Sequence, residues 1–370
     1  MARRVLVTGG AGFIGANFVH YWVDRHPEDH VIVLDALSYA GNLASLQSLE
    51  ARPTYRFVHG DIRDQRLVEP LLREEGIDTI VHFAAESHVD RSILAPDAFI
   101  ETNVVGTHNL LKAAKAVWLE ENPAPRHRFH HVSTDEVYGS LGPTDSPFSE
   151  TTPYDPSSPY AASKAASDHL VRAYHRTYGL GITISNCSNN YGPYQFPEKL
   201  VPLTIVNILE GKPIAVYGDG ENIRDWLYVD DHCRGIELIL EKGEPGEIYN
   251  IGGHNEWKNI DVVKLICDLL DELFNYDASL HKRFPQSPAG RAGSASSLIR
   301  FVEDRPGHDR RYAIKPDKAQ VSLEYQTGQS FEAGIRKTIQ WFLHNEIWWR
   351  SVMDGSYQGW LKTQYSNHRS

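Results

Sequence analysis

The sequence predicts an α/β protein built on a Rossmann-type, doubly wound parallel sheet, with a smaller, mixed α/β domain beside it. Two observations favour this fold class. Short β-branched runs alternate with helical segments through the first half of the chain, a pattern typical of parallel strands that helices cover on both faces. A glycine-rich run, Thr8 to Gly15, also joins the first of these strands to the first helix, as in dinucleotide-binding folds.

The expected strands alternate with segments whose apolar residues recur three and four positions apart. Residues 13–25, for example, place Ile14, Phe18, Tyr21 and Trp22 on one side of a helix. The expected strands are Val5–Thr8, Val31–Leu34, Arg56–His59, Thr79–Phe83 and His130–Ser133.

The alternation becomes less regular in the later half of the chain, so a second domain is expected mainly there. We expect a nucleotide-binding domain over 1–188 and 225–250, and a substrate-binding domain over 189–224 and 251–370. A chain of 370 residues is long enough for one large domain and a smaller one.

Two later segments have unusual compositions. Gln286–Ser297 is rich in Pro, Gly, Ser and Ala, and is expected to form a surface loop with no chemistry of its own. The tail carries Trp341, Trp348, Trp349 and Trp360. Such an aromatic tail is expected to pack against the domain or a partner subunit.

Composition and charge narrow the function classes. The chain has 37 Lys and Arg against 48 Asp and Glu, a net charge of −11, which argues against a protein that coats nucleic acid. Its start lacks a secretory signal, and no apolar run reaches roughly 18 residues, so no membrane-spanning helix is expected. Cys187, Cys233 and Cys267 form no CxxC pair, and the 18 histidines show no HExxH spacing. We therefore expect a cytoplasmic protein with reduced, mostly buried thiols and no metal site.

The glycine-rich run has the spacing of a site for a nicotinamide dinucleotide. Gly9, Gly12 and Gly15 permit a tight turn, close approach of the backbone to a pyrophosphate, and close helix packing, although the run alone could be an ordinary turn. Asp35 ends the second expected strand, where it would accept hydrogen bonds from ribose hydroxyls and repel a 2′-phosphate. NAD is therefore favoured over NADP. The alternative is that Asp35 is a helix cap or a loop residue.

Asp61-Ile62 follows the third expected strand and is suited to contact the adenine, by analogy of fold only. Asp61 could instead cap the helix that begins near Asp64. Both interpretations of Asp61 remain open at the level of the sequence.

A tyrosine and a lysine lie four residues apart in Tyr160-Ala-Ala-Ser-Lys164, on one side of an expected helix. The ordinary phenol pKa of about 10 is too high for a base at neutral pH, but a nearby ammonium group and a positive nicotinamide ring would both favour the phenolate. Tyr160 could then remove a hydroxyl proton while hydride leaves the same carbon for NAD. The spacing is common by chance and gains weight here from the glycine-rich run upstream.

Two adjacent carboxylates follow the fifth expected strand, in Ser133-Thr134-Asp135-Glu136. Open parallel sheets bind ligands at the carboxyl ends of their strands. One carboxyl group could protonate a leaving hydroxyl while the other removes a proton from carbon, provided that their pKa values differ. The alternative is that Asp135 is only a helix cap.

Together with several other runs, these motifs resemble the dTDP-glucose 4,6-dehydratases, a family of the extended short-chain dehydrogenases. The resemblance covers most of the chain and is least informative near 286–297 and in the last residues. The Thr-Asp-Glu run above all separates this family from its epimerase and decarboxylase relatives. The matching runs are TGGAGFIG (8–15), LDALSYAGN (34–42), HFAAESHVDRS (82–92), STDEVYG (133–139), YAASK (160–164), SNNYGPYQFPEKL (188–200), RDWLYVDDH (224–232), YNIGGHNE (249–256) and DRPGHDRRY (304–312).

The resemblance implies a three-stage reaction in one site. Tyr160, assisted by Lys164, takes the proton of the sugar 4-hydroxyl as C4 hydride reduces NAD, while Thr134 hydrogen-bonds the C4 oxygen. The 4-ketone acidifies C5, so that Glu136 removes the C5 proton while Asp135 protonates the departing C6 hydroxyl. Hydride then returns to C6 and a proton to C5. The product is a 4-keto-6-deoxy sugar, and NAD remains tightly bound and is regenerated at each turnover.

The resemblance also assigns ligand-binding positions. For Arg224 there is a physical argument as well, because its planar fork suits a diphosphate; a surface ion pair is the alternative. His82 and His88 could be acid–base groups, but packing or hydrogen-bonding roles explain them at least as well. The further cofactor positions are Phe13, Ile14, Phe83, Ala84, Ala85, Thr102 and Asn190, and the further substrate positions are Ser87, Asn189, Lys199, Leu200, Tyr217, Asn259, Asp304, Arg305 and His308.

Two alternative functions stay open. A sugar-nucleotide 4-epimerase shares the glycine-rich run and the Tyr/Lys pair, but it eliminates no water and needs no Asp-Glu pair. An inactive, NAD-sensing scaffold is the second, and the intact catalytic residues argue against it. A homodimer formed through helices of the nucleotide-binding domain, and dTDP-glucose as substrate rather than a UDP sugar, rest on the resemblance alone.

Overall fold

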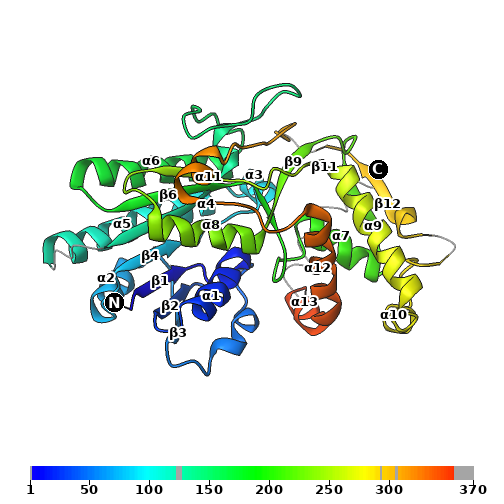
Figure 1. The fold of residues 1–370 in the computed structure, drawn as a ribbon, viewed down its shortest axis with the longest axis horizontal. Coiled ribbons are helices and arrows are strands. Elements are labelled where there is room, and N and C mark those ends of the chain that lie inside the picture. Colours follow the sequence, from blue (N-terminus) through cyan, green and yellow to red (C-terminus); the bar gives the residue numbers. More distant parts are fainter. Residues whose placement is uncertain (1, 122–126, 292–293, 305–306, 354–370) are drawn as a thin grey trace.

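The computed structural model describes residues 2–121, 127–291, 294–304 and 307–353, and its main layer is a seven-stranded parallel sheet (Figure 1). The strands are β1 (Arg4–Thr8), β2 (His30–Asp35), β3 (Tyr55–His59), β4 (Thr79–His82), β5 (Arg128–Thr134), β6 (Ile182–Cys187) and β10 (Ile248–Ile251). Their order is β10-β6-β5-β4-β1-β2-β3, and every neighbouring pair is parallel. The order reverses between β1 and β4, so the sheet is doubly wound, as predicted.

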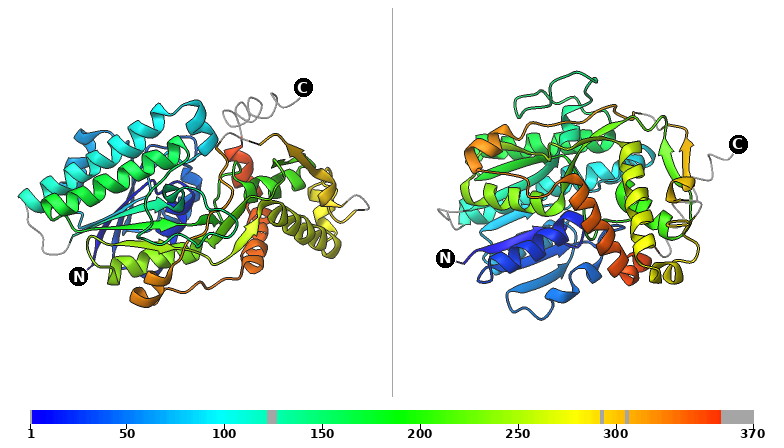
Figure 2. Two further views of the ribbon diagram at one scale, coloured as in Figure 1. Left: turned by 90° about the horizontal axis from the view of Figure 1, so that it is seen from above. Right: turned by 45° about the vertical axis from the view of Figure 1, so that its right-hand side comes forward.

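Alternate side chains of the central strands reach opposite faces of this sheet. Val5 and Val7 of β1 pack with α1 (Phe13–Arg25) and α8 (Val229–Lys242). Leu6, between them, packs on the other face with α2 (Gln65–Glu74), α5 (Thr107–Lys115) and α6 (Pro159–Tyr178). In the left view of Figure 2, α5 and α6 lie side by side on one face and α8 lies on the other. Helices therefore cover both faces.

The first helix spans Phe13–Arg25, the range that its apolar periodicity indicated. The five expected strands are also confirmed, with ends that differ by one or two residues. Such agreement follows from strong local patterns, since each strand is a short β-branched run between segments of helical spacing.

The later half of the chain forms two small sheets and a helical cluster beside the main sheet (Figure 1). One sheet has the order β11-β9-β7, and the other pairs β12 with β8. These strands are β7 (Asn189–Tyr191), β8 (Ile214–Tyr217), β9 (Ile223–Tyr228), β11 (Glu256–Lys258) and β12 (Ile299–Val302), and the helices are α7 (Leu200–Leu209), α9 (Asn259–Tyr276), α12 (Phe331–His344) and α13 (Glu346–Val352). The expected domain boundaries stay a prediction, and α11 (Asp317–Leu323), although late in the chain, packs against β10 and α8.

Shorter elements complete the described fold. No helix in the described ranges is both long and apolar enough to cross a membrane. The short helices are α3 (Val89–Leu94), α4 (Asp97–Phe99) and α10 (Ser279–Arg283), the π-helices are η3 (Ile100–Gly106) and η4 (Ala116–Glu121), and the 3-10 turns are η1 (Leu43–Ser45), η2 (Gln47–Leu49), η5 (Asp135–Tyr138) and η6 (Ala295–Leu298).

The aromatic tail packs against its own chain. Trp348 and Trp349 are buried, and the Trp348 Nε1–H donates to the Ser45 hydroxyl at 3.1 Å. Trp360 lies outside the described residues. The three cysteines are free and buried, as expected.

The expectation of a surface loop over Gln286–Ser297 is wrong for part of that segment. Ala289 and Ala295 are completely buried in the helical cluster. Asp271 of α9 explains the packing, because its carboxylate accepts hydrogen bonds from the Gly290 N–H, the Ala295 N–H and the Ser294 hydroxyl. Small residues at these positions let the loop lie close to α9.

Candidate active site

The glycine-rich run turns closely against the loop that follows β4. Gly9 has a φ of +70°, and a Cβ there would lie 2.6 Å from the Cα of Ala84. A Cβ on Gly15 would lie 2.2 Å from the carbonyl oxygen of Gly9, so side chains are excluded at both positions. Gly12 is the N-cap of α1 and supplies no capping side chain. The first N–H groups of α1 can therefore donate to the phosphates of a ligand.

Asp35 is held at the end of β2, beside this run. Its Oδ2 accepts a hydrogen bond from the Ala11 N–H at 2.9 Å and its Oδ1 accepts one from the Leu37 N–H at 2.8 Å. Burial raises the pKa of this carboxyl group. The neighbouring N-cap positions belong to Gly12 and Asn42, so Asp35 caps neither helix. Each carboxylate oxygen can accept a further hydrogen bond, as ribose hydroxyls require.

Asp61 is not the cap of α2, because Asp64 takes that place and accepts from the Arg66 N–H. Asp61 instead accepts hydrogen bonds from the Arg63 backbone N–H and guanidinium. Burial acts to raise the pKa of Asp61, but these bonds outweigh it and lower the pKa. The side chain of Ile62 is buried in the core.

The two adjacent carboxylates begin the turn η5 at the carboxyl end of β5. Thr134, not Asp135, is the N-cap of this turn: its Oγ1 accepts from the Glu136 N–H at 3.3 Å. The capping interpretation of Asp135 is therefore wrong. Asp135 is 1% exposed and its Oδ2 has no hydrogen-bond partner within the described part of the chain, whereas Glu136 is half-buried.

The environment of Asp135 favours its protonated form. Burial, and then the negative charges of Glu136 and Asp225, raise the pKa of Asp135 well above its ordinary value. A carboxyl group that keeps its proton at neutral pH can serve as a general acid. The structure thus supplies, for Asp135, the perturbation that a division of labour between two carboxylates requires.

Tyr160 and Lys164 lie on the first two turns of α6, where Ser158 is the N-cap and Pro159 the first residue. Both side chains are buried, and the phenol of Tyr160 hydrogen-bonds with Thr134. The phenol therefore lies at the same strand end as the two carboxylates.

The pKa of Tyr160 is raised in the protein alone. Burial, followed by the negative charge of Glu136, raises it well above the ordinary value. The ammonium group of Lys164 is held nearby on the same helix, where its Nζ donates to the Val132 carbonyl at 2.9 Å. Burial also lowers the pKa of Lys164 to about 8, so this residue is mostly charged at neutral pH.

Arg224 is a buried cation of the site and not a surface ion pair. It is 5% exposed, and its guanidinium donates to the carbonyls of Ile223 at 2.8 Å and Asp309 at 3.0 Å. Its Cζ lies 4.3 Å from the ring centroid of Tyr312. The charge of Arg224 acts to lower the pKa of Asp135, which places it near the carboxylates.

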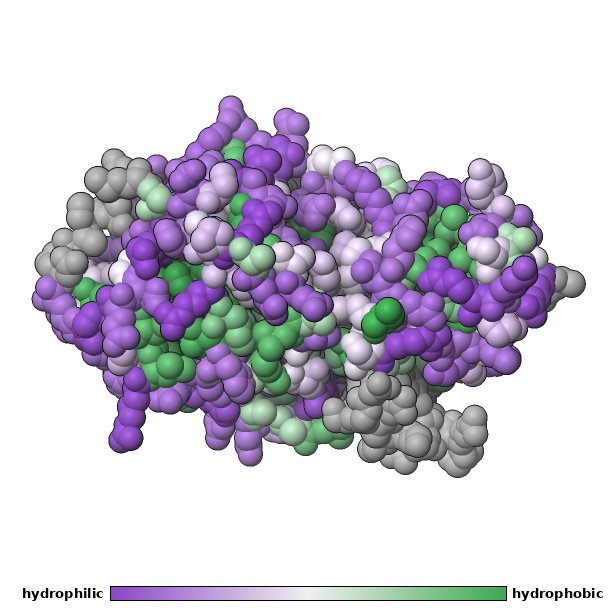
Figure 3. Space-filling view, turned by 90° about the horizontal axis from the view of Figure 1, so that it is seen from below, coloured by the Kyte–Doolittle hydropathy of each residue, from purple (hydrophilic) through white to green (hydrophobic). Residues whose placement is uncertain are grey.

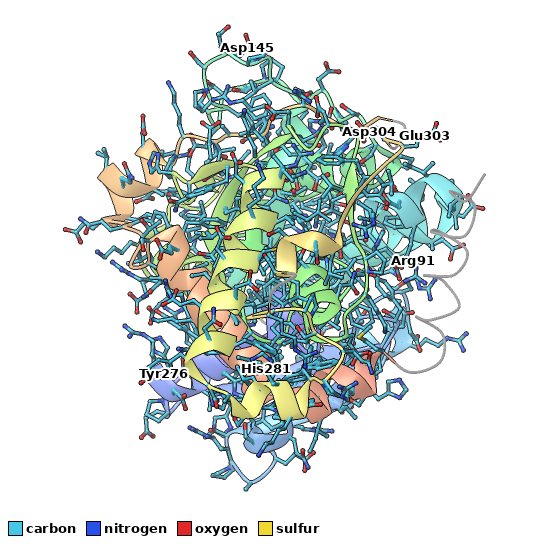
Figure 4. The ribbon with its side chains drawn as sticks, turned by 90° about the vertical axis from the view of Figure 1, so that its right-hand side faces the viewer. Arg91, Asp145, Tyr276, His281, Glu303 and Asp304 are labelled. Carbon is cyan, nitrogen blue, oxygen red and sulfur yellow. The ribbon has the colours of Figure 1, made fainter. Side chains whose placement is uncertain are left out.

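The other predicted substrate positions come from several loops. Lys199 Nζ donates to the Ser87 carbonyl at 3.0 Å, so the segment before α7 is bonded directly to the loop after β4. The His308 Nδ1 lies 2.6 Å from Asp304 Oδ1 in the same loop, and the His308 ring lies 6.1 Å from that of Tyr217, at the end of β8. Figure 4 shows Asp304 and Arg91 toward the same side of the molecule, away from Tyr276.

The remaining predicted positions are distributed as follows. Asn189 and Asn190 open β7, Leu200 opens α7 and Asn259 opens α9. Phe83, Ala84 and Ala85 follow β4, Thr102 lies in the π-helix η3, and Phe13 and Ile14 begin α1. Arg305 lies outside the described residues.

The two histidines considered as acid–base candidates have structural partners. His82 is 1% exposed, and its ring nitrogens lie 2.7 Å from Thr8 Oγ1 and 2.9 Å from Thr107 Oγ1. Burial lowers the pKa of His82 well below its ordinary value. His88 Nε2 lies 3.6 Å from Glu198 Oε2.

Sequence reasoning missed several buried polar residues near the catalytic groups. Asn103 of η3 donates to the Glu86 carbonyl and to the Ser163 hydroxyl, and so ties the loop after β4 to α6. Asp168 and His131 are fully buried near Lys164. The signal for Asp168 was its spacing, four residues after Lys164 on the same side of α6.

One group in the described ranges could share a metal ion, namely His26, Glu237 and Glu241. Glu237 already accepts hydrogen bonds from Tyr21 and Arg25 and lies 2.8 Å from the ring of His26. The expectation of no metal site stays a prediction.

Comparison with known proteins gives consistent results. Residues 6–338 match the family model described as GDP-mannose 4,6 dehydratase. The chain is 54% identical over 359 residues to the dTDP-glucose 4,6-dehydratase of Neisseria meningitidis serogroup B. This alignment covers 96% of this chain and 98% of the relative. The chain is 50% identical over 376 residues to that of Salmonella typhimurium, covering 99% and 100%.

Solved structures of similar proteins include two functional classes. A Streptomyces venezuelae dTDP-glucose 4,6-dehydratase with NAD bound superposes with a TM-score of 0.83 at 48% identity, covering 94% of this chain and 99% of the other. A Thermotoga maritima UDP-glucose 4-epimerase with UDP-glucose has a TM-score of 0.77 at 27% identity, covering 93% and 99%.

Proposed function

The chain belongs to the dTDP-glucose 4,6-dehydratase family, and on that premise we propose how its residues divide the reaction among them. The protein is an NAD-dependent enzyme that converts dTDP-glucose to dTDP-4-keto-6-deoxyglucose and water. We class it as a lyase, because water leaves without net oxidation. The observation that carries the proposal is the pair Asp135–Glu136 beside Tyr160, since elimination of water needs both an acid and a base.

The residues around the glycine-rich run fit NAD. The N-terminal N–H groups of α1 have no capping side chain, and Asp35 is held by two backbone N–H groups at the end of β2. We propose that Asp61 and Ile62 border the adenine, and that Phe83–Ala85, Thr102 and Asn190 complete the site. When bound, NAD accepts hydride from C4 of the sugar and returns it to C6.

Tyr160 is the proposed base for the 4-hydroxyl proton. Its phenol is hydrogen-bonded with Thr134, so both oxygens can meet the C4 oxygen of the sugar. In the protein alone burial raises the pKa of Tyr160, so release of its proton depends on positive charge nearby. Lys164, with a pKa of about 8, supplies one such charge.

Asp135 and Glu136 are the proposed acid and base of the elimination. Burial and the charge of Glu136 raise the pKa of Asp135 and so favour its protonated form, which delivers a proton to the departing C6 hydroxyl. Glu136, the more exposed of the two, removes the C5 proton once the 4-ketone has acidified C5. A proton returns to C5 in the last step.

Arg224 is the proposed partner of the substrate diphosphate. Its guanidinium is oriented by the Ile223 and Asp309 carbonyls and by the Tyr312 ring, and its planar fork matches phosphate oxygens. The sugar and nucleotide are proposed to contact the other positions carried by the family resemblance, namely Ser87, Asn189, Lys199, Leu200, Tyr217, Asn259, Asp304, Arg305 and His308.

We further propose a homodimer in the cytoplasm. Ile93 and Leu94 of α3 and Ile100 and Val105 of η3 are exposed although apolar, and a second copy of the chain could cover them. Figure 3 shows hydrophobic residues gathered on the lower face of the molecule, between hydrophilic ones. Free, buried cysteines suit a reducing compartment. Analytical ultracentrifugation would test the dimer, which predicts twice the mass of one chain.

The function is tested by incubating the purified protein with dTDP-glucose and identifying the product by mass spectrometry and NMR. We expect a 4-keto-6-deoxy sugar nucleotide, with no net formation of reduced cofactor. A mixture of dTDP-glucose and dTDP-galactose would overturn the proposal in favour of an epimerase. Recovery of unchanged dTDP-glucose, with NAD bound, would favour the inactive scaffold.

A further inference from the structure

An ionisable cluster lies within the protein behind the Tyr160–Lys164 pair. Asp168 stands one turn after Lys164 on α6 and is completely buried. Residues four apart on a helix share one side, so Tyr160, Lys164 and Asp168 form a row along α6. A buried carboxylate is costly unless it is paired and hydrogen-bonded, so the partners of Asp168 indicate what it does.

Asp168 has two hydroxyl donors from outside α6. Its Oδ2 accepts hydrogen bonds from the Ser133 hydroxyl of β5 and from the Tyr154 hydroxyl, each at 2.9 Å. Both donors are neutral and bond best to an ionised acceptor. They therefore stabilise the carboxylate without cancelling its charge.

The other oxygen of Asp168 faces His131 of β5. His131 is completely buried, and its Nε2 lies 3.2 Å from Asp168 Oδ1, whereas its Nδ1 has no hydrogen-bond partner in the part of the chain that the structure describes. Asp168 Oδ1 likewise has no hydrogen-bond partner in that part of the chain, so the 3.2 Å approach of the ring leaves the charge on this oxygen without a donor of its own. Burial lowers the pKa of His131 well below its ordinary value, so the ring is neutral.

The same imidazole nitrogen lies 3.5 Å from Lys164 Nζ. The ammonium group thus has the Val132 carbonyl at 2.9 Å as its hydrogen-bond acceptor and, one side chain further, the carboxylate of Asp168. Among the causes that act on the pKa of Lys164, burial lowers it most and Asp168 is the first that raises it. In turn, burial raises the pKa of Asp168 to about 6, and Lys164 is the first group that opposes this.

We propose that Asp168 is a positioning residue, the buried counter-charge that keeps Lys164 protonated and directed along α6, so that Lys164 can support proton removal by Tyr160. This inference rests on the proposed function, because it concerns the base of the C4 oxidation. It differs from a purely structural role in that the carboxylate charge itself, and not only its hydrogen bonds, is needed.

The pH dependence follows from the groups that face Asp168. They are Lys164 and His169 of α6, His131 and Ser133 of β5, and Tyr154 of the preceding loop. His131 in turn lies near His82 of β4, which burial keeps neutral. The charged pair is therefore Lys164 and Asp168, and removing the carboxylate lowers the pKa of Lys164. With less positive charge nearby, Tyr160 holds its proton more tightly.

The test is the pH profile of kcat/KM for Asp168→Asn, measured with dTDP-glucose on the full-length protein. We expect kcat/KM near neutral pH to fall about 10- to 100-fold, and the rise of the profile with pH to move upward by about 1–2 units. Activity should then recover as the pH is raised. Asp168→Glu retains the negative charge and should keep the midpoint of the rise near that of the wild type, even if kcat falls.

The matched control is Asp29→Asn, which removes another buried carboxylate. Asp29 is 8% exposed and accepts hydrogen bonds from the Arg3 N–H and the Trp22 Nε1–H. It should lower the melting temperature without moving the midpoint. An Asp168→Asn profile that is lowered equally at every pH, or is unchanged, overturns the proposal. Wild-type turnover of dTDP-glucose decides the proposed function separately, so the two failures are distinguishable.

Discussion

The carboxyl end of β5 with α6 and the substrate-side loops around β7 and β9 hold their polar groups in different ways. Around α6, Lys164 donates to Val132 O, and Asp168 is bonded to Ser133 and Tyr154. On the substrate side, the buried side-chain oxygens of Asn189, Asn222 and Asn259 have no hydrogen-bond partner among the described residues. Around β5 and α6 the buried atoms without a partner among the described residues belong to ionisable groups, namely Asp135 Oδ2, Asp168 Oδ1 and His131 Nδ1. On the substrate side the three atoms are amide oxygens, which can accept hydrogen bonds from a ligand.

The difference separates proton transfer from recognition. Groups that move protons need fixed positions and shifted pKa values before the substrate arrives, and the contacts of β5 and α6 provide both. Groups that recognise a ligand gain most when their hydrogen bonds form only with that ligand, because a wrong ligand leaves them unpaired. We therefore expect changes at the end of β5 to alter single steps of turnover, and changes on the substrate side to alter KM.

The largest effect is expected from Glu136→Gln, which keeps the size of the side chain and removes the base. Because only the elimination needs this base, dehydration should slow about 10²- to 10⁴-fold, while oxidation at C4 persists. Rapid mixing with dTDP-glucose should then show the absorbance of the reduced cofactor rise and remain. Product analysis on the same samples measures the dehydration step.

Glu150→Gln is the matched control, since Glu150 is also half-buried and accepts the Asn250 N–H at 2.9 Å. It should leave both steps close to wild type. Equal slowing of oxidation and dehydration in Glu136→Gln would contradict the division of roles between Asp135 and Glu136.

On the substrate side, Arg224→Lys should raise KM for dTDP-glucose about 10- to 100-fold, with a smaller change in kcat. A lysine keeps the charge but loses the planar fork, and hydrogen bonds to charged groups contribute about 1.5–3 kcal/mol. Steady-state kinetics measures this. Arg311→Lys is the matched control, because Arg311 is 8% exposed and pairs with Glu256. An unchanged KM in Arg224→Lys would break the comparison between the two regions.

Local patterns were sufficient for much of the fold and of the site. The bounds of α1, the strand ends to within one or two residues, and the tight turn at Gly9 follow from residues that are near one another in sequence or from a fixed motif. The same holds for Thr134, Asp135 and Tyr160, because the end of one strand and the start of one helix bring these three residues together.

Contacts between distant segments could not be predicted in this way. Trp348 meets Ser45, and Asp168 meets Ser133, only because the chain returns to the same place. The raised pKa of Tyr160 in the protein alone could not be predicted either, since burial, its largest cause, depends on the whole fold. A lysine four residues away was visible in the sequence, but the direction of its ammonium group was not.

The smallest effect is expected from His232, which lies where the two regions meet. His232 is completely buried, its Nδ1 is 3.0 Å from Asn190 Oδ1, and burial lowers its pKa to about 3. Since the unfolded chain binds this proton near the ordinary pKa of about 6.5, the neutral ring contributes stability fully above that pH, and the contribution is lost as pH falls toward 3. At a pH of about 5.5 the loss is about 1.4 kcal/mol.

His232→Gln should therefore remove about 1.2 kcal/mol of the decrease in the free energy of unfolding between pH 7 and about 5.5, since about 0.2 kcal/mol of the loss is already present at pH 7. Urea denaturation at both pH values measures this difference, and the same substitution at the exposed His59 is the control. Because Asn190 is a proposed cofactor contact, the variant should also bind NAD less tightly. If His232→Gln lost stability with acid as steeply as the wild type, His232 would not be held neutral, and the contrast between the proton-transfer region and the ligand-dependent region would weaken at their boundary.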